Sequence, residues 1–426
     1  RSLVGSEMCI RDRAEIVRRE QARITVLSAM SGTTDSLVRI SRAAASGDRN
    51  AIEEQLAMLT DKYTRCIEEL LRERKQQALA RMNATFGLIR DEAAAFEEYE
   101  SERKIIAQGE LLTSAIFTAY LQETGLKAEC LYSPDFMVKD PGEKVDTERI
   151  GRALARVAGD DSTFFVAQGF ICSDSQGRID NLGRGGSDYS AALMGAAVEA
   201  AEVQIWTDID GMHNNDPRFV DNTRPIRTMS FDEAAELAYF GAKILHPATI
   251  QPCKDHGIAV LLKNTMDPEA PGTTISNRDD DTKSFHAVAA KDGITVIRIH
   301  SARMLMAYGF LRKVFEIFEQ YRTPIDMITT SEVAVSLTVD NDSHIDEIVR
   351  DLSALGSIEI ERGNSIVCVV GRMEHGDAGL AARVFECVRG VPIKMISYGA
   401  SHRSLAILID TEHKKRTLQC LNDGLF

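Results

Sequence analysis

The sequence has no run of about 20 consecutive apolar residues, so no segment is predicted to cross a bilayer as a helix. Its eight cysteines form no CxxC pair and share no zinc-ligand spacing with histidine, so we expect neither a metal site nor a disulfide framework. Scattered thiols suit a reducing compartment, and no secretion or lipidation signal is evident, so we expect a cytoplasmic protein without a membrane partner. The 64 acidic residues outnumber the 50 basic ones, and this net charge of -14 argues against a nucleic-acid partner.

What the sequence does contain is an alternation of short apolar runs with helical patterns. With about 150 residues per domain, its 426 residues predict two or three domains. Strands are expected at 24–28, 130–132, 164–167, 203–207 and 259–262, and helices from about 35, at 191–201 and at 231–240. This alternation predicts an α/β fold with a mainly parallel sheet that is covered on both faces.

The stretch 50–106 is polar, free of proline and rich in helix formers. Apolar residues recur at three- and four-residue steps from Ile52 to Leu70, which is the spacing of one buried helical face. We therefore expect a helical insertion here, with a break at Gly87.

The composition changes at 276–281, a polar and acidic stretch that we expect to be a linker. Beyond it the pattern becomes shorter and repeats. The first pass has strands at 294–299, 324–329 and 334–339 and a helix at 311–321; the second has strands at 365–370, 393–397 and 405–409 and a helix at 380–388. The repeat predicts two small α+β modules of the βαββ type.

A glycine-rich run, LGRGGSDY at 182–189, comes directly before a predicted helix. Glycines let the backbone approach a ligand closely, and free amide groups at a helix start attract an anion. Arg184 offers a planar donor for a carboxylate or phosphate, and Asp188 can accept hydrogen bonds from an ammonium group. The same spacing also fits a plain glycine turn in which Asp188 caps the helix.

Two further runs place polar side chains after apolar segments. One is WTDIDG at 206–211, followed by Asp216-Pro217-Arg218, at a strand end of the kind where α/β proteins bind ligands. Arg218 fits a phosphate contact or a structural role, and Trp206 is expected in the core. The other is FGAKILHP at 240–247, in which Lys243 could supply positive charge over transferring phosphates, while His246 is expected to be structural.

These runs, in this order, resemble the aspartate kinase family from about Ala14 to Phe426. The matching segments are SAMSGTTD at 28–35, QGE at 108–110, QGF at 168–170, LGRGGSD at 182–188, WTD at 206–208, DPR at 216–218, and FGAK with HP at 240–247. Ala107 stands where that family usually has serine. The resemblance implies an amino-acid-kinase sandwich as the catalytic domain at 14–277, followed by two ACT-like regulatory domains at 278–361 and 362–426.

The resemblance also implies roles for single residues. Arg184 would bind the α-carboxylate of L-aspartate, while Glu110 and Asp188 would hold its ammonium group. The rest of the substrate pocket would be Thr34, Phe170, Gly183 and Ser187. ATP, arriving with Mg²⁺, would be bound by Thr207, Asp208, His213, Asp216, Arg218 and Lys243, although relatives often carry tyrosine at the place of His213. The catalytic residues would be Lys243, Asp188 and Arg184.

The implied reaction transfers a phosphoryl group from ATP to the side-chain carboxylate of aspartate. Its product, 4-phospho-L-aspartate, opens the route to lysine, threonine and methionine. Both reactants are anions and the nucleophile is already ionised, so catalysis requires positioning and charge neutralisation rather than a general base. A related kinase acting on glutamate or uridylate fits the substrate motifs and the paired modules less well.

One part of the family pattern is missing. The family begins with a strand and a Lys-Phe-Gly-Gly-Thr-type phosphate loop, and nothing before Ala14 matches it. Residues 1–13 (RSLVGSEMCIRDR) resemble a translated sequencing adapter, so we expect a non-native leader and impaired catalysis. The alternative is a non-catalytic, amino-acid-binding regulatory protein, against which the retention of Arg184, Asp188, Glu110 and Lys243 argues.

The tail segment ITTSEVAV at 328–335 resembles the ACT domains of lysine-inhibited aspartate kinases. It implies an amino-acid effector, with L-lysine the expected one. The effector pocket would comprise Met304, Gly309, Phe310, Leu311, Ile325 and Asp326, with Thr330, Ser331 and Glu332 at its edge or at a subunit interface. Met304, Phe310 and Leu311 fit a plain core role equally well. ACT units usually pair through sheet edges, so we expect a homodimer or higher homo-oligomer.

Overall fold

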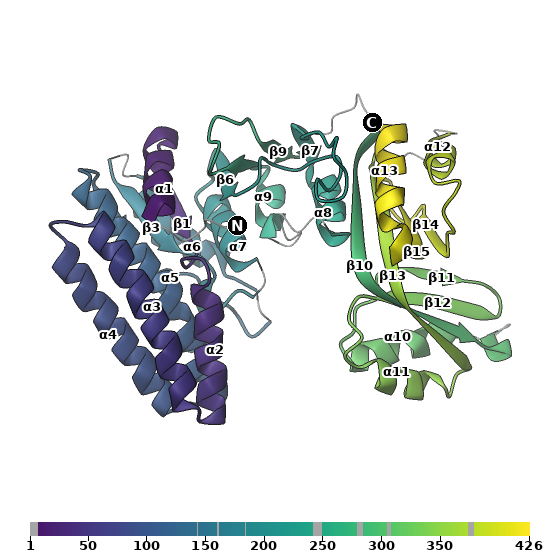
Figure 1. Cartoon of the computed structure of the whole chain (residues 1–426), viewed down its shortest axis with the longest axis horizontal. Helices are drawn as coiled ribbons and strands as arrows, with labels where there is room; N and C mark the ends of the chain where they lie inside the picture. Colours follow the sequence, from purple (N-terminus) through teal and green to yellow (C-terminus); the bar gives the residue numbers. More distant parts are fainter. Residues whose placement is uncertain are drawn as a thin grey trace. The chain divides into compact units, whose positions relative to one another are not determined.

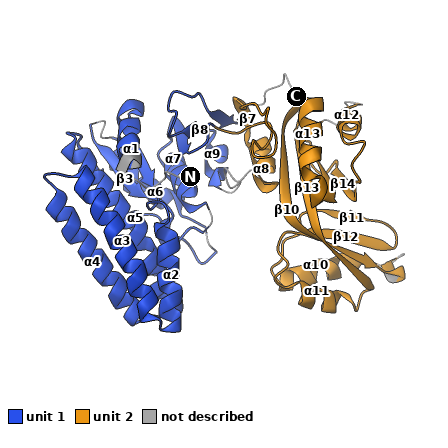
Figure 2. Ribbon diagram, viewed as in Figure 1, with its two compact units in different colours: residues 1–210, 248–277 blue, residues 211–247, 278–426 orange. Residues whose placement is uncertain are grey.

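The structure is a computed structural model that describes residues 7–142, 144–159, 162–183, 185–241, 249–278, 284–304, 308–373 and 379–426. The chain forms two compact units (Figure 2). Unit 1 consists of residues 1–210 and 248–277, and unit 2 consists of residues 211–247 and 278–426. The segment 211–247 thus packs with the C-terminal residues, and the domain boundaries after 277 and 361 stay predictions. No helix within the described ranges is long and apolar enough to cross a membrane.

Parallel strands form the centre of unit 1. In one sheet, β3 (Phe164–Gln168) lies between β1 (Ile24–Leu27) and β2 (Ala128–Cys130), and both pairings are parallel. In a second sheet, β6 (Glu202–Thr207) runs parallel to β8 (Ala259–Asn264), which pairs antiparallel with β9 (Thr273–Ser276). A small hairpin of β4 (Ile171–Ser173) and β5 (Ile179–Asn181) follows β3. The mainly parallel α/β fold predicted from the sequence is confirmed.

Side chains on β3 show how its sheet is covered. Val166 belongs to a core formed with the long helices, whereas Phe165 and Ala167 belong to a second core on the other face. That second face is covered by α6 (Thr147–Ala158) and α7 (Gly186–Ala197). Because both faces are buried, β3 begins with the continuous apolar run FFVA at 164–167 instead of an alternating pattern. Unit 1 also contains α1 (Glu7–Glu20), the 3₁₀ turn η1 (Ser133–Asp135) and α9 (Gln251–His256).

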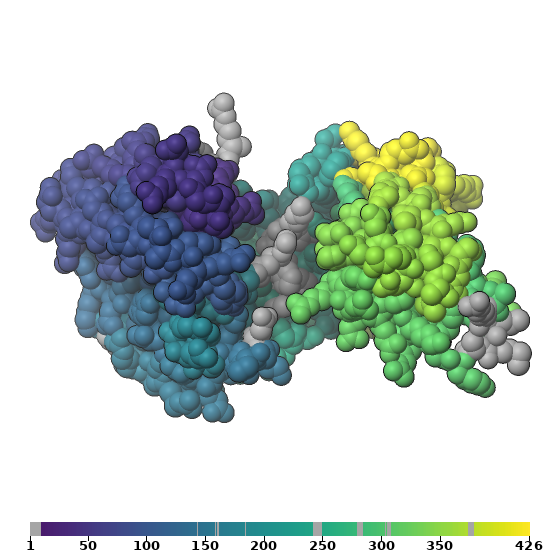
Figure 3. All heavy atoms as spheres, turned by 90° about the horizontal axis from the view of Figure 1, so that it is seen from below, coloured from purple at the N-terminus to yellow at the C-terminus, as the bar shows by residue number. Residues whose placement is uncertain are grey.

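Four long helices form the insertion predicted for unit 1. They are α2 (Thr33–Ser46), α3 (Arg49–Leu70), α4 (Lys75–Ala94) and α5 (Glu98–Glu123), seen in purple and blue at one side of Figure 1. Their side chains interlock in one apolar core in which Leu56, Tyr63 and Phe117 are fully buried. In the space-filling view of Figure 3, blue atoms of this insertion cover a broad part of the surface of unit 1.

The helix break predicted at Gly87 is wrong, because Gly87 lies inside α4. The chain instead turns at residues 71–74, between α3 and α4. There the carboxylate of Glu123 accepts hydrogen bonds from the backbone amides of Arg72, Glu73 and Arg74. A carboxylate from the end of α5 thus satisfies the free amides that precede α4, and no local sequence signal marks this long-range partner.

Unit 2 is built on one six-stranded antiparallel sheet of order β11-β12-β10-β13-β15-β14. Its strands are β10 (Phe285–His300), β11 (Ile328–Thr330), β12 (Ala334–Val339), β13 (Ser357–Gly371), β14 (Met395–Tyr398) and β15 (Ser404–Asp410). The strands predicted at 294–299 and 365–370 are parts of the much longer β10 and β13. Of the strand predicted at 324–329, only the end is extended, as β11.

The predicted pair of modules is present, but β10 and β13 run through both. The first module comprises residues 294–363 and includes α10 (Phe310–Gln320) and α11 (Ile345–Leu352). The second module comprises residues 285–293 and 364–425 and includes α12 (Leu380–Cys387) and α13 (Lys414–Leu425). Where each strand crosses between modules it carries a glycine with positive φ, Gly293 at 76° and Gly363 at 79°. Two 3₁₀ turns, η3 (Ala302–Met304) and η4 (Thr411–His413), complete the tail; α11 and α13 were not predicted.

A segment from the middle of the chain covers the other face of the second module. The short strand β7 (Thr228–Ser230) leads into α8 (Phe231–Tyr239), which packs against β13 and β10. Val367 and Val369 of β13 face α12 and α13, whereas burial and the nearby Glu236 of α8 raise the pKa of the intervening Cys368. The predicted helix at 231–240 is confirmed, and its capping box, made by Ser230 and Glu233, fixes where it begins.

Candidate active site

Loops at the carboxyl ends of β1 and β3 meet the start of α7 in unit 1. The Ser28 hydroxyl donates to the Ser187 hydroxyl at 2.8 Å. Close packing here requires glycine: a Cβ on Gly169 would lie 2.6 Å from Ser187 Oγ, and one on Gly186 would lie 2.7 Å from Cδ2 of Phe170. The structure thus brings together three segments that the sequence singled out separately.

Phe170 is held in an unusual conformation at this junction. Its φ is 67°, in the left-handed region that bulky residues rarely adopt, and its backbone N–H donates to Ser190 Oγ at 3.0 Å. Strained backbone of this kind persists only where the surroundings enforce it, and it clusters at ligand sites. Phe170 thus lies at this junction beside Gly186 and Ser190, and its role in substrate binding stays a prediction.

Two carboxyl groups at the site lack a cationic partner among the described residues. Glu110, on α5, is 3% exposed; its Oε1 accepts a hydrogen bond from the Ala29 amide at 3.3 Å, and its Oε2 has no partner within the described ranges. Burial raises the pKa of Glu110 to about 7 and that of Asp188 to about 6. Both carboxyls are therefore costly to ionise without a positively charged neighbour.

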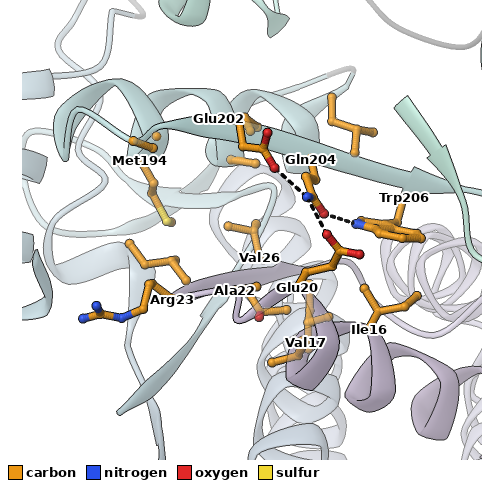
Figure 4. Close-up of a pocket in the computed structure, with 18 of the residues that line it drawn as sticks. Ile16, Val17, Glu20, Ala22, Arg23, Val26, Met194, Glu202, Gln204 and Trp206 are labelled. Carbon is orange, nitrogen blue, oxygen red and sulfur yellow. Dashed lines mark hydrogen bonds between the residues drawn. The ribbon is translucent and has the colours of Figure 1, made fainter. Parts of the chain in front are cut away.

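A cavity of about 550 Å³ lies in unit 1 and is lined by Asp188 but not by Glu110. Ser28, Ser187 and Asp188 line one end, and β1 and β6 line its length; within the described residues each of these strands pairs on one side only. Figure 4 shows the wall at β6, where Gln204 donates to Glu20 at 3.0 Å and accepts from the Trp206 indole at 2.9 Å. Trp206, expected in the core, is partly exposed to this cavity.

The residues predicted to bind ATP are divided between the units. Thr207 and Asp208 end β6 in unit 1, where the Thr207 hydroxyl donates to Asp208 at 3.2 Å. In unit 2, Arg218 makes a two-pronged ion pair with Asp216 at 2.9 and 2.6 Å, and His213 Nδ1 lies 2.9 Å from the Thr223 hydroxyl. Arg184 and Lys243 lie outside the described residues, so their predicted roles stay predictions.

Sequence reasoning missed two residues of α3 that hold the loop after β1. Lys62 donates to the carbonyl oxygen of Ser31 and, at 3.3 Å, to the Thr33 hydroxyl; the Tyr63 hydroxyl lies 3.3 Å from the same Thr33 and 3.2 Å from Thr113. Burial lowers the pKa of Lys62. Periodicity places Tyr63 on the buried face of its helix, but nothing in a polar helical stretch marks Lys62. Beside them, the predicted Thr34 lies in the first turn of α2 and is partly buried.

The predicted effector residues gather in the first module of unit 2. Gly309, with φ 76°, caps α10, and Phe310 is 8% exposed within the core of this module. Met304, Leu311 and Ile325 pack against that core, whereas Thr330, Ser331 and Glu332 lie exposed at the turn between β11 and β12. The Asp326 side chain is only 2% exposed. Its Oδ1 already accepts hydrogen bonds from Lys291 and Tyr239, each at 2.8 Å, and its role in effector binding stays a prediction.

Comparisons with known proteins agree with this architecture. The model of the amino acid kinase family matches residues 2–264, and that of an ACT domain matches residues 367–425. Lysine-sensitive aspartokinase 3 of Escherichia coli is 33% identical over 430 residues, which are 95% of this chain and 92% of that protein. The chloroplastic aspartokinase 1 of Arabidopsis thaliana is 32% identical over 438 residues, 96% of this chain and 75% of that protein.

Two solved structures of E. coli aspartokinase III are similar over almost their whole length. The complex with aspartate and ADP, in the R-state, has a TM-score of 0.86 at 31% identity and covers 99% of this chain and 97% of that one. The complex with lysine and aspartate, in the T-state, has a TM-score of 0.83 at 31% identity and covers 100% and 98%.

A parallel α/β unit with a glycine-bounded helix start, joined to ACT-type modules, defines the class of amino acid kinases with a regulatory tail. Within that class, the chain belongs to the aspartokinase family. The resemblance drawn from the sequence motifs, and the enzyme class that it implied, are thereby confirmed.

Proposed function

We propose that this chain uses ATP to phosphorylate the side-chain carboxylate of L-aspartate, giving 4-phospho-L-aspartate, at the head of lysine, threonine and methionine biosynthesis. The observation that carries the proposal is a pair of carboxyls near the Ser28–Ser187 contact, the buried Glu110 and the partly buried Asp188, whose pKa values are both raised by burial. An amino-acid ammonium group would satisfy both carboxyls at once. The relative that was solved with aspartate and ADP supports this choice of ligand.

Phosphoryl transfer requires that this site orient its substrates and supply positive charge. The amides around Gly183–Gly186, at the start of α7, suit an anionic group, and Arg184 would complete the cradle for the α-carboxylate. On the nucleotide side, Thr207, Asp208, His213, Asp216, Arg218 and Lys243 are the proposed contacts. Because the nucleophile is an already ionised carboxylate, no residue has to remove a proton from it.

Mg²⁺ is proposed to arrive with the nucleotide. No group of three or more metal-ligating side chains gathers within the described ranges, but Asp208 and Thr207 offer oxygen ligands at the end of β6. A magnesium ion held mainly by phosphates needs only one or two such carboxylates. Bound there, it would neutralise charge on the phosphates.

We further propose that the first module senses an amino acid, with L-lysine as the expected effector. Asp326 would bind an ammonium group, and Met304, Gly309, Phe310, Leu311 and Ile325 would shape the pocket. The lysine-bound relative supports this assignment. Pairing of two chains through Thr330, Ser331 and Glu332 at the β11–β12 turn, and a cytoplasmic location, complete the proposal.

Two measurements test the proposal. Turnover is followed by coupled ADP release, with the acyl phosphate trapped as a hydroxamate. Aspartate and ADP binding are followed by calorimetry, which reports on the site independently of turnover. Glu110→Gln is expected to weaken aspartate binding roughly 10- to 100-fold, because a charge-assisted hydrogen bond is lost. Glu98→Gln, at the exposed start of the same helix, is the matched control.

The same titrations distinguish the kinase from the competing function, a protein that only senses an amino acid. A purely sensing protein would bind L-lysine, release no ADP, and show the same aspartate affinity with and without nucleotide. Coupling between aspartate and nucleotide binding would support the kinase site even at low turnover.

A further inference from the structure

A buried carboxylate in unit 2 joins the end of α8 to the first module. Asp326 Oδ1 accepts a hydrogen bond from the Tyr239 hydroxyl at 2.8 Å and another from the Lys291 ammonium group at 2.8 Å. Lys291 also lies 2.8 Å from Asp340 and 4.6 Å from the centre of the Tyr239 ring. Asp326 Oδ2 is buried and has no partner within the described residues. Asp326 Oδ1 therefore already accepts two hydrogen bonds, whereas Oδ2 can accept one from a further donor.

The backbone next to Tyr239 is held at the same place. Gly241 has a φ of 119°, and a Cβ there would lie 2.2 Å from the carbonyl oxygen of Ala290. Ala290 directly precedes Lys291 on β10, so the chain leaving α8 touches this strand at two neighbouring points. Figure 1 shows α8 beside β10, consistent with these contacts. Backbone packing and a side-chain hydrogen bond thus fix the end of α8 together.

Tyr239 lies between two functional segments. It immediately precedes Phe240-Gly241-Ala242-Lys243, the run that would bind ATP, and its hydroxyl contacts Asp326, the residue that would bind the effector. Burial and the Asp326 carboxylate raise the pKa of Tyr239, so the phenol remains a proton donor at neutral pH. A single hydrogen bond therefore links the segments on which nucleotide and effector binding depend.

We propose that the Tyr239–Asp326 hydrogen bond is the contact through which the effector acts on the nucleotide segment. With the bond made, Tyr239 positions the end of α8 for nucleotide binding. An effector ammonium group that binds the unpartnered Oδ2 of Asp326 draws negative charge away from Oδ1, which weakens the hydrogen bond from the Tyr239 hydroxyl and loosens this anchor. The inference rests on the effector site proposed above, and it makes Tyr239 a positioning residue and not a catalytic one.

Because coupling between two binding sites is reciprocal, the proposal predicts the direction in which each affinity changes. If effector binding breaks the bond, then removing the hydroxyl relieves the effector of that cost, and the effector binds more tightly. Nucleotide binding, which the anchor favours, becomes weaker by a similar factor. A hydroxyl with a merely structural role would leave effector binding unchanged or weaken it.

The experiment titrates the full chain and its Tyr239→Phe variant with L-lysine and with ADP in Mg²⁺ buffer. We expect the Kd for lysine to fall roughly three- to tenfold and the Kd for ADP to rise roughly three- to tenfold, the effect of one hydrogen bond to a charged group. Tyr321→Phe is the matched control: its hydroxyl donates to Asp351 at 2.7 Å in the same module, away from α8. Both affinities should stay within about twofold in that variant.

Asp326→Asn separates the failure of the inference from the failure of the effector site. If Asp326→Asn abolishes lysine binding while Tyr239→Phe leaves lysine affinity unchanged or weaker, the coupling contact is overturned and the effector site stands. If Asp326→Asn binds lysine as well as the parent chain does, the effector site itself is wrong, and the inference is overturned with it. Unchanged melting temperatures for both variants would show that the affinity changes do not come from unfolding.

Discussion

Glu110 shows what a single buried side chain contributes to this site. α5 places it in the wall of the helical insertion, where it is 3% exposed and its Oε1 accepts a hydrogen bond from the Ala29 amide. An ionised carboxylate at such a place is costly, which is why its pKa rises to about 7. For the same reason we expect Glu110 to favour ligands that carry a positive group, because such a group offsets the free energy needed to ionise the buried carboxyl.

Aspartate binding should therefore depend on pH through Glu110 and Asp188. Between about pH 6 and pH 7 Glu110 still holds a proton that the ligand ammonium must displace, so affinity should rise by up to about tenfold per pH unit, and more steeply below pH 6, where Asp188 is protonated as well. Binding at pH 6.5 should also release protons. Calorimetry in buffers of different ionisation enthalpy measures that release, and a pH-independent affinity without proton release would contradict the prediction.

The ligand-free protein should show the reverse trend in stability. Because the pKa of Glu110 rises from 4.5 to about 7 on folding, the folded chain holds more protons than the unfolded chain between these values, and stability falls as the pH increases through this window. Glu110→Gln should remove that loss, which amounts to at most about 3 kcal/mol. Urea unfolding at pH 5 and pH 8 should show a larger gain for Glu110→Gln at pH 8, and no such difference for Glu98→Gln.

The sequence predicted many residues of the site because their chemistry depends on short local runs. Gly169 and Gly186 could be recognised in QGF and LGRGGSD, where the absence of a side chain is itself the signal. Lys62 could not, because its role depends on α3 packing across the loop at Ser31. A contact between distant segments leaves no trace in the spacing of either one.

At the scale of single elements, α4 offers a direct test of the wrong prediction at Gly87. The residue is helical and has open space at the position of a Cβ, so Gly87→Ala should stabilise unit 1 by about 0.5–1 kcal/mol. Gly177→Ala provides the contrast, because Gly177 also has open space but a φ of 78°, so alanine there should destabilise. Urea denaturation followed by circular dichroism measures both; equal signs would refute the argument.

Strand lengths were the least predictable feature of the elements. The apolar pattern located 294–299 and 365–370, since these stretches lie against helices. It failed on the remainder of β10 and β13, because Ser357–Gly363 is largely exposed and reads as a loop when its pairing partner is unknown. Antiparallel pairing over many residues depends on tertiary contacts, which local composition does not encode.

At the scale of the whole molecule, assembly is the property to test. The edge strands of the sheet in unit 2 expose large apolar side chains, with Ile328 of β11 37% exposed and Ile396 of β14 43% exposed. Open edges of this kind readily pair with another chain. We expect sedimentation to show a dimer that Ile328→Lys weakens, while Met58→Lys, at an exposed apolar residue of α3, leaves it intact. An unchanged dimer in Ile328→Lys would move the interface elsewhere.

The paired modules have a consequence for how this tail can be altered. The first module is one contiguous stretch, 294–363, whose two ends enter and leave on neighbouring strands at Gly293 and Gly363, while the second module is completed by residues on either side of it. The first module is thus inserted between the two strands that complete the second module. A different sensing specificity could be grafted by exchanging 294–363 alone and rejoining the host strands at these glycines. The second module could not be exchanged in the same way, because the first module interrupts its sequence.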